Sequence, residues 1–203
     1  MWEFEKWQRS AFRKEWGACY NVVKPIKIIL DIIVLGIAIH LVVVTDTHDF
    51  GQRITTPVLK YCVGFFVLSA LYVLFDFVQL FGIGLAASGI LCILILEAVS
   101  AYLVFTIRDF TTPTFIARSS EVAFANWRLD FIYQRFQNFE GCVGLNISKD
   151  NCGHECCDDV FVSKLTSYFN HIKNVDIVAL ICIVLGVIIF TLPALIAQVF
   201  WVA

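Results

Sequence analysis

Four long apolar stretches dominate this chain and restrict what it can fold into. They cover roughly residues 24–44, 57–81, 85–107 and 177–200. Each is close to the ~20 residues that an α-helix needs to cross the hydrocarbon core of a bilayer. Because lipid offers the backbone no hydrogen-bond partners, a segment that crosses it must be helical. The sequence therefore predicts an all-α membrane protein with four transmembrane helices.

The composition agrees with this prediction. Hydrophobic residues make up 59% of the 203-residue chain and charged residues only 16%, and the mean hydropathy of +0.79 is too high for a soluble domain of this size. The net charge of −2 leaves no basic face for a nucleic acid. The first 20 residues are charged and amphipathic, so we expect the first span to act as an uncleaved signal anchor.

The basic residues predict the orientation. They cluster before the first span, at Lys6, Arg9, Arg13, Lys14, Lys24 and Lys27. The positive-inside rule then places the N-terminus in the cytosol, and four crossings return the C-terminus there. We expect a cytosolic segment over 1–23, three spans within 24–107, a large external loop over 108–174, and the fourth span with a short C-terminal end over 175–203.

The external loop carries two features of a lumenal or extracellular segment. Asn146 begins an Asn-Ile-Ser acceptor for N-glycosylation. An even set of four cysteines, Cys142, Cys152, Cys156 and Cys157, predicts disulfides in an oxidising compartment. Three pairings are open, and we favour those that join Cys156 and Cys157 separately to Cys142 and Cys152. Zinc held by the last three cysteines and His154 is the alternative, but this spacing is tight for a tetrahedral site.

The other cysteines fall in different places. Cys62, Cys92 and Cys182 lie within apolar stretches, where we expect them to be small packing residues. Cys19 lies just before the first span, so it is either a palmitoylation site or an ordinary cytosolic thiol.

Helical periodicity continues into the external loop. Apolar residues recur at three- and four-residue steps over 114–139, which predicts an amphipathic helix that continues from the third span. Residues 140–160 are rich in Gly, Asn, Asp and Cys and should form a loop. Residues 160–173 should form a second helix that leads into the fourth span. A small helical domain of this kind buries a small core, which disulfides would reinforce.

Ionisable residues occur within the predicted spans. Asp31, Asp76 and Glu97 lie at membrane depth, where each costs roughly 2.5–3.5 kcal/mol and is expected to face the bundle interior. Glu97 is the best candidate for a buried, protonated carboxyl, whereas Asp76 and Lys60 lie near span ends and can reach water. His40 should lie near the external interface. We find no basic partner at matching depth, so we favour a structural polar contact over a proton or ion site.

This layout resembles the tetraspanins, which have four spans and a large cysteine-rich external loop. The matching segments are 96–102 around Glu97, 139–144 around Cys142, and 164–186 into the fourth span, with Asp31 in place of the usual Asn of the first span. Several features depart from the family pattern, among them a cytosolic turn without its usual cysteines and a longer N-terminal tail. Gly141 replaces the first cysteine of the CCG motif, Ile183 stands near the usual polar residue of the fourth span, and the C-terminal tail is short.

The resemblance implies a non-enzymatic membrane scaffold that binds other integral membrane proteins laterally and organises them. Small residues over 82–89 would allow close helix approach, either within the monomer or in a homo-oligomer. The family also implies residence in the plasma membrane or in endosomal or secretory membranes, with no cofactor beyond an enclosed sterol or lipid. The alternative is a stoichiometric accessory subunit of a channel, transporter or receptor. A transporter or proton-coupled enzyme that uses Asp31, Glu97 and His40 is the third reading.

Overall fold

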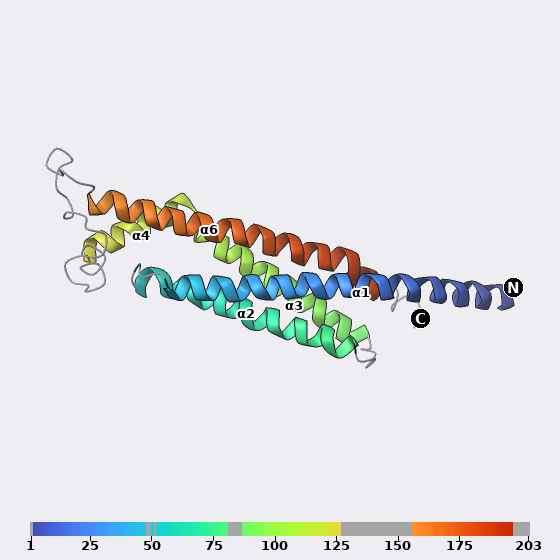
Figure 1. Cartoon of the computed structure of the whole chain (residues 1–203). Helices are drawn as coiled ribbons and strands as arrows, with labels where there is room; N and C mark the ends of the chain where they lie inside the picture. Colours follow the sequence, from blue (N-terminus) through green and yellow to red (C-terminus); the bar gives the residue numbers. More distant parts are fainter. Residues whose placement is uncertain (1, 48–49, 51, 81–86, 127–155, 197–203) are drawn as a thin grey trace.

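The chain folds into long helices that lie side by side (Figure 1). The computed structural model describes residues 2–47, 50, 52–80, 87–126 and 156–196. The regular elements in this part of the chain are helical: α1 Trp2–Thr47, α2 Gln52–Leu80, α3 Ala87–Asp109, α4 Pro113–Asn126, α6 Cys157–Gly186 and the π-helical turn η2 Val187–Thr191.

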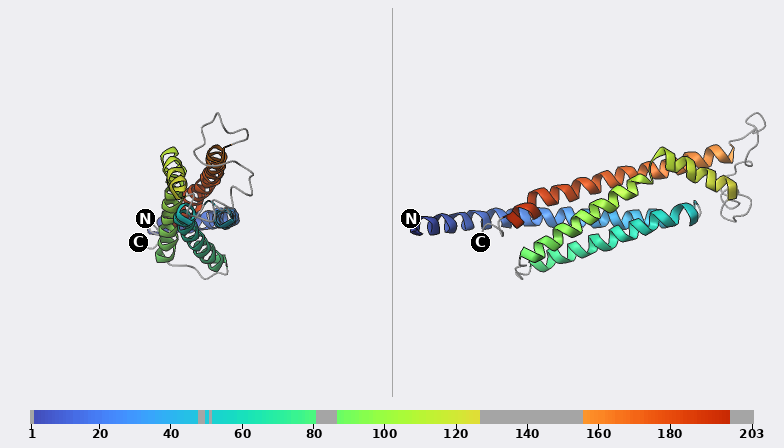
Figure 2. Two further views of the ribbon diagram at one scale, coloured as in Figure 1. Left: turned by 90° about the vertical axis from the view of Figure 1, so that its left-hand side faces the viewer. Right: turned by 180° about the vertical axis from the view of Figure 1, so that it is seen from behind.

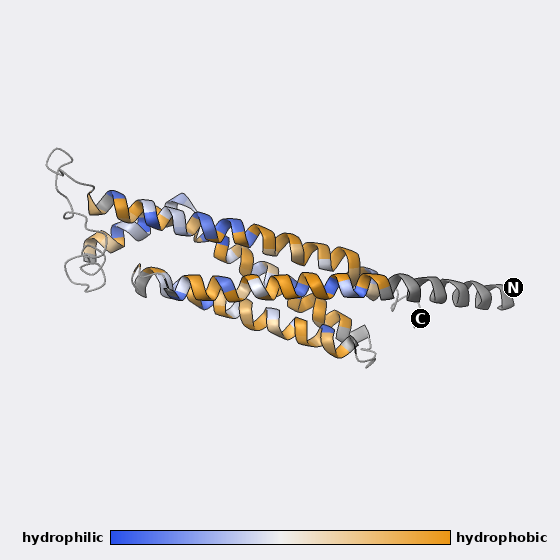
Figure 3. Cartoon of the chain, in the orientation of Figure 1, coloured by the Kyte–Doolittle hydropathy of each residue, from blue (hydrophilic) through white to orange (hydrophobic). Residues whose placement is uncertain are grey.

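Four of these helices are long and apolar enough to cross a membrane, as the sequence predicts. The candidate spans are Val22–Asp46, Ile54–Val78, Ile90–Asp109 and a stretch within Asp159–Ile196. Hydrophobic residues predominate along these helices (Figure 3). Side chains such as Leu74, at 60% exposed, and Tyr102, at 66%, point outward. A helical bundle that exposes apolar side chains over its outer surface is stable in lipid but not in water. The chain is therefore a multi-pass membrane protein.

The four helices form a closed ring of neighbours. α1 packs against α2, α2 against α3, and α6 closes the ring against both α3 and α1. Two further views show this arrangement end-on and from behind, with the N-terminal part of α1 extending past the other helices (Figure 2). The interior is filled by apolar side chains such as Leu41, Val58 and Phe65, which are fully buried.

A sharp turn separates α3 from α4. The amides of Phe110 and Thr111 bond to carbonyls three residues earlier, and Thr112 Oγ1 donates to the carbonyl of Asp109 at 2.8 Å. Pro113 then occupies the first helical position, where its missing N–H costs nothing and its fixed φ suits the helix. The helix expected over 114–139 therefore begins as predicted but does not continue from the third span, and its part beyond Asn126 lies outside the described residues.

α6 runs without a break from Cys157 into the bundle, and at 1.5 Å per residue its 30 residues extend about 45 Å. The helix expected over 160–173 and the fourth span are thus one helix. The π turn η2 follows, and the N–H of Leu192, the residue after it, bonds to the carbonyl of Val187. Pro193 explains this widening, because its ring displaces the carbonyl four residues earlier, at Ile189, and it offers no amide to it.

Candidate functional site

Four ionisable side chains meet inside the membrane-spanning bundle, and we call them the Lys27 cluster: Lys27, Asp31, Asp76 and Glu97. All four are 2–5% exposed. Lys27 Nζ lies 2.6 Å from both carboxyl oxygens of Asp31, 3.0 Å from Asp76 Oδ2 and 2.9 Å from Glu97 Oε1. One ammonium therefore joins three helices, α1, α2 and α3.

Helix geometry brings these residues together. Lys27 and Asp31 are four residues apart on α1 and so share one face. α2 returns antiparallel to α1, which places Asp76, near the end of α2, at the level where α1 enters the bundle. α3 then presents Glu97 from its inward face.

Two expectations about these residues are wrong. Lys27, counted among the cytosolic basic residues, is the buried basic partner that we did not expect to find. Asp76, expected to reach water, is 4% exposed. The i,i+4 spacing of Lys27 and Asp31 is the sequence signal that points to this pairing, because an isolated lysine at a span end would instead snorkel.

The fourth span covers the Lys27 cluster. A Cβ placed on Gly186 would lie 3.3 Å from Lys27 Cδ and 3.8 Å from Glu97 Oε1, so the absence of a side chain lets α6 approach closely. Thr191 Oγ1, in the π turn, donates to Glu97 Oε1 at 3.1 Å. Tyr72 completes the surroundings, with its ring centroid 5.4 Å from Lys27 Nζ, a cation–π distance.

The cluster has more acidic groups than basic ones. Among the described residues, no hydrogen-bond partner lies within reach of Asp76 Oδ1, Glu97 Oε2, Tyr72 Oη or Ser100 Oγ. In the same part of the chain, no group of three or more His, Cys, Asp or Glu side chains has the arrangement of a metal site. Chemically, the site can fix the relative rotation of its helices, and it can bind positive charge.

A further buried carboxyl lies on α6. Asp176 is 1% exposed, and within the described ranges both of its oxygens lack a hydrogen-bond partner. Sequence reasoning did not single it out, because the apolar stretch that marks the fourth span begins one residue later, at 177. Its position at the edge of a strongly apolar stretch was the available signal.

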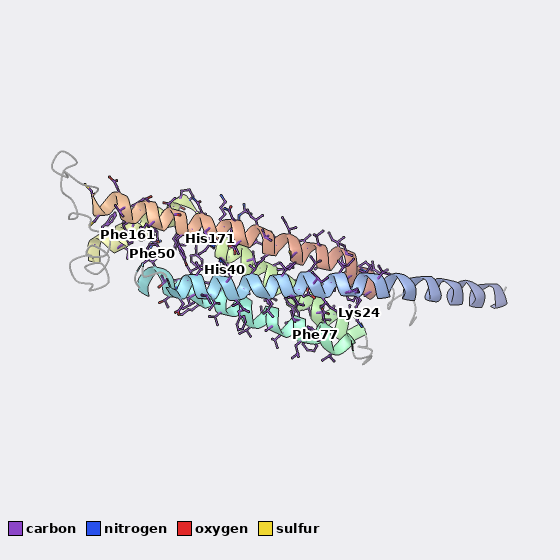
Figure 4. All side chains as sticks on the ribbon, viewed as in Figure 1. Lys24, His40, Phe50, Phe77, Phe161 and His171 are labelled. Carbon is purple, nitrogen blue, oxygen red and sulfur yellow. The ribbon has the colours of Figure 1, made fainter. Side chains whose placement is uncertain are left out.

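The opposite end of the bundle is held by aromatic rings. We call this network the aromatic junction: Phe50, Phe110, Phe115, Phe124, Phe161, Tyr168 and Phe169. Phe50, from the α1–α2 connection, lies 5.8 Å from Phe161 and 5.2 Å from Tyr168 between ring centroids. Figure 4 shows Phe50 and Phe161 side by side at this end. Tyr168 Oη also donates to Thr45 Oγ1 at 3.0 Å, which ties α6 to α1.

Two histidines meet between the two ends. Nε2 of His40, on α1, lies 2.9 Å from Nε2 of His171, on α6 (Figure 4). Both side chains are exposed. At this distance one ring nitrogen donates and the other accepts, so the two rings link α1 to α6.

The predicted cysteine and modification sites are only partly described. Cys62 and Cys182 are buried, as expected for packing residues, but Cys92 is exposed on α3, so its expectation is wrong. Cys156 and Cys157 are not free thiols. The side chains of Cys19, Cys142, Asn146 and Cys152 lie outside the described residues, so the pairing, the glycan and the palmitoylation stay predictions. Lys60 is exposed on α2, as expected.

No protein-family model, curated protein or solved structure matches the chain. The resemblance to tetraspanins therefore stays a prediction.

Proposed function

We propose that the chain is a membrane scaffold that binds other integral membrane proteins laterally and organises them, as the resemblance to tetraspanins implies. One observation supports this most: α6 is continuous from the cysteine-bearing loop into the bundle. It packs against the aromatic junction at one end and covers the Lys27 cluster at the other. A partner bound at the external loop would thus be held at a fixed position relative to the spans.

The outward faces of the spans suit lateral contacts. The four members of the Lys27 cluster point inward, while apolar side chains point outward along the bundle. Helices associate in lipid through close van der Waals packing and through interhelical hydrogen bonds. A transmembrane helix of a partner would therefore bind through complementary packing against these faces. The external loop would supply the selectivity for that partner.

We place both termini in the cytosol and the loop outside, with disulfides among the four loop cysteines and a glycan on Asn146. Removal of N-glycans by a glycosidase should increase the gel mobility of the wild-type protein and leave Asn146→Gln unchanged. Labelling of the loop in intact cells by a membrane-impermeant reagent provides the second test. A loop that reacts only after the plasma membrane is opened, with no internal vesicle pool, contradicts this orientation.

Photo-crosslinking from defined positions tests the scaffold function. A photoreactive residue would replace Leu74 on α2, Tyr102 on α3 or Ile188 in η2, which are 60%, 66% and 57% exposed. Matched controls at Val34 and Ile93, both 1% exposed, should give only intramolecular products. We expect protein adducts from a subset of the exposed positions. Adducts to lipid alone from every exposed position would contradict lateral binding of proteins.

The stoichiometry of the adducts separates the scaffold from an accessory subunit. A broad set of partners in low ratios supports the scaffold, and one partner in a fixed ratio supports the accessory role. Ion or solute transport by the purified protein alone in liposomes, abolished by Glu97→Gln, would overturn both.

A further inference from the structure

We propose that the Lys27 cluster is a proton-binding site that holds two protons at neutral pH, one on Glu97 and one on the remaining pair of carboxyls around the ammonium. This inference does not depend on the proposed function. It assigns a ligand, the proton, to a buried site that has one basic group and three acidic groups.

Charge balance requires added positive charge. Three ionised carboxylates and one ammonium would leave two negative charges uncompensated inside a bundle that is surrounded by lipid. Unpaired charge at membrane depth is costly, and it is avoided by pairing or by neutralisation. Two bound protons make the cluster neutral while Lys27 keeps one carboxylate as its counter-ion.

The contacts of Glu97 indicate which of its oxygens carries one of the two protons. Its Oε1 accepts from Thr191 and lies 2.9 Å from Lys27 Nζ, whereas its Oε2 is buried and, in the described part of the chain, meets no donor. A bare anionic oxygen at Oε2 would lose its solvation and gain nothing. A protonated Oε2 removes that charge, and Oε1 then acts as a carbonyl that accepts both contacts.

The geometry of Asp31 and Asp76 places the other proton. Both carboxyls contact the same Nζ, at 2.6 Å and 3.0 Å, so they face each other across one ammonium. Two carboxylates this close repel each other strongly in a medium of low dielectric constant, and one bound proton relieves that repulsion.

The packing favours a proton over a metal cation. Gly186 closes the cluster so tightly that an added Cβ would meet Lys27 at 3.3 Å. From α2, the titratable groups that face Lys27 are Asp76 and Tyr72. α6 and η2 present Gly186 and Thr191, which do not titrate, and Asp176 lies about 15 Å further along the helix at 1.5 Å per residue.

A release of these protons should weaken the bundle. The folded protein holds protons that the same carboxyls lose in the unfolded chain at neutral pH, so stability must fall as pH rises. The negative charges left behind repel one another and separate α3 and η2 from α1 and α2.

Infrared spectroscopy of the full-length protein in lipid nanodiscs tests the proposal. An Asp176→Asn background removes the separate buried carboxyl. At neutral pH we expect a carbonyl band from protonated carboxyl groups that shifts in D₂O, and Glu97→Gln should remove about half of it because one of two protons is lost. Glu121→Gln, on exposed α4, should leave the band unchanged. Absence of the band, or an unchanged band in Glu97→Gln, would overturn the proposal.

Thermal unfolding between about pH 6 and about pH 9 gives an independent readout. Wild-type stability should decline with rising pH, and Glu97→Gln should show a shallower decline because Gln carries no releasable proton. If Glu97→Gln does not fold, the wild-type band and Asp31→Asn still test the site. Stabilisation by NaCl or KCl at fixed pH, with no protonated carboxyl band, would show that a metal cation supplies the charge and would overturn the proton assignment.

Discussion

The two ends of the bundle are stabilised by different interactions: buried ion pairs at one end and aromatic packing at the other. At one end, the Lys27 cluster joins α1, α2 and α3 through a single ammonium, with Thr191 donating from η2. At the other, the aromatic junction joins α4, α6 and the α1–α2 connection through ring contacts at 4.9–5.9 Å. A polar cluster in lipid depends on every partner being present, because a lone buried charge is costly. An aromatic cluster tolerates changes that preserve its volume.

The largest expected effect comes from removing the only basic member of the Lys27 cluster. Lys27→Met leaves three buried carboxyls without their ammonium and should lower the free energy of unfolding by about 3–5 kcal/mol. Reversible unfolding in mixed detergent micelles would measure it. Adding Asp31→Asn should restore part of the stability, since it removes one negative charge. Lys60→Met, on the exposed face of α2, is the control and should change little.

The same comparison predicts a large but different effect in the aromatic junction. Phe161 is fully buried, so Phe161→Ala should cost about 3 kcal/mol through the cavity that it leaves. Phe161→Leu should recover most of this, because volume matters here more than a particular partner. Hydrogen exchange should show faster opening of α4. If Phe161→Leu proved as damaging as Phe161→Ala, the junction would depend on ring geometry and not on volume.

Gly186 tests how closely the fourth span must approach the Lys27 cluster. Gly186→Leu should cost about 1–3 kcal/mol, because its side chain would overlap the stem of Lys27. Gly36 provides a matched control in α1, since a Cβ there would meet nothing within 4 Å. Gly36→Leu should be neutral or slightly stabilising through helix propensity. Equal effects of the two substitutions would mean that close approach of α6 is unimportant.

The smallest expected effects come from removing one hydroxyl group at each end of the bundle. Thr191→Val removes the donor to Glu97, and Tyr168→Phe removes the donor to Thr45, so each should cost about 1 kcal/mol. The two variants should differ in pH dependence, however. Only Thr191→Val should alter the decline of stability with pH, because only that hydroxyl contacts a member of the Lys27 cluster. If both variants showed the same pH profile of stability, the hydrogen bond from Thr191 would have no influence on proton binding at the Lys27 cluster.

Sequence alone determined the helical segments and their relation to the membrane. The four spans, the start of α4 at Pro113 and the helix that leads into the fourth span all follow from local hydropathy and backbone geometry. These properties belong to single segments, because a span must satisfy its own backbone hydrogen bonds in lipid. The acidic residues within the spans were equally visible in the sequence.

Only the tertiary structure decided which of the ionisable residues in the spans contact one another. The rotation of each helix about its axis and its depth relative to its neighbours depend on packing between segments, and no single segment encodes them. Lys27 near a span end has two outcomes, to reach outward to water or to turn inward, and only the positions of Asp76 and Glu97 on other helices select the second. For the same reason, the contacts of Gly186 and of Thr191 with this site became apparent only when α6 closed the bundle.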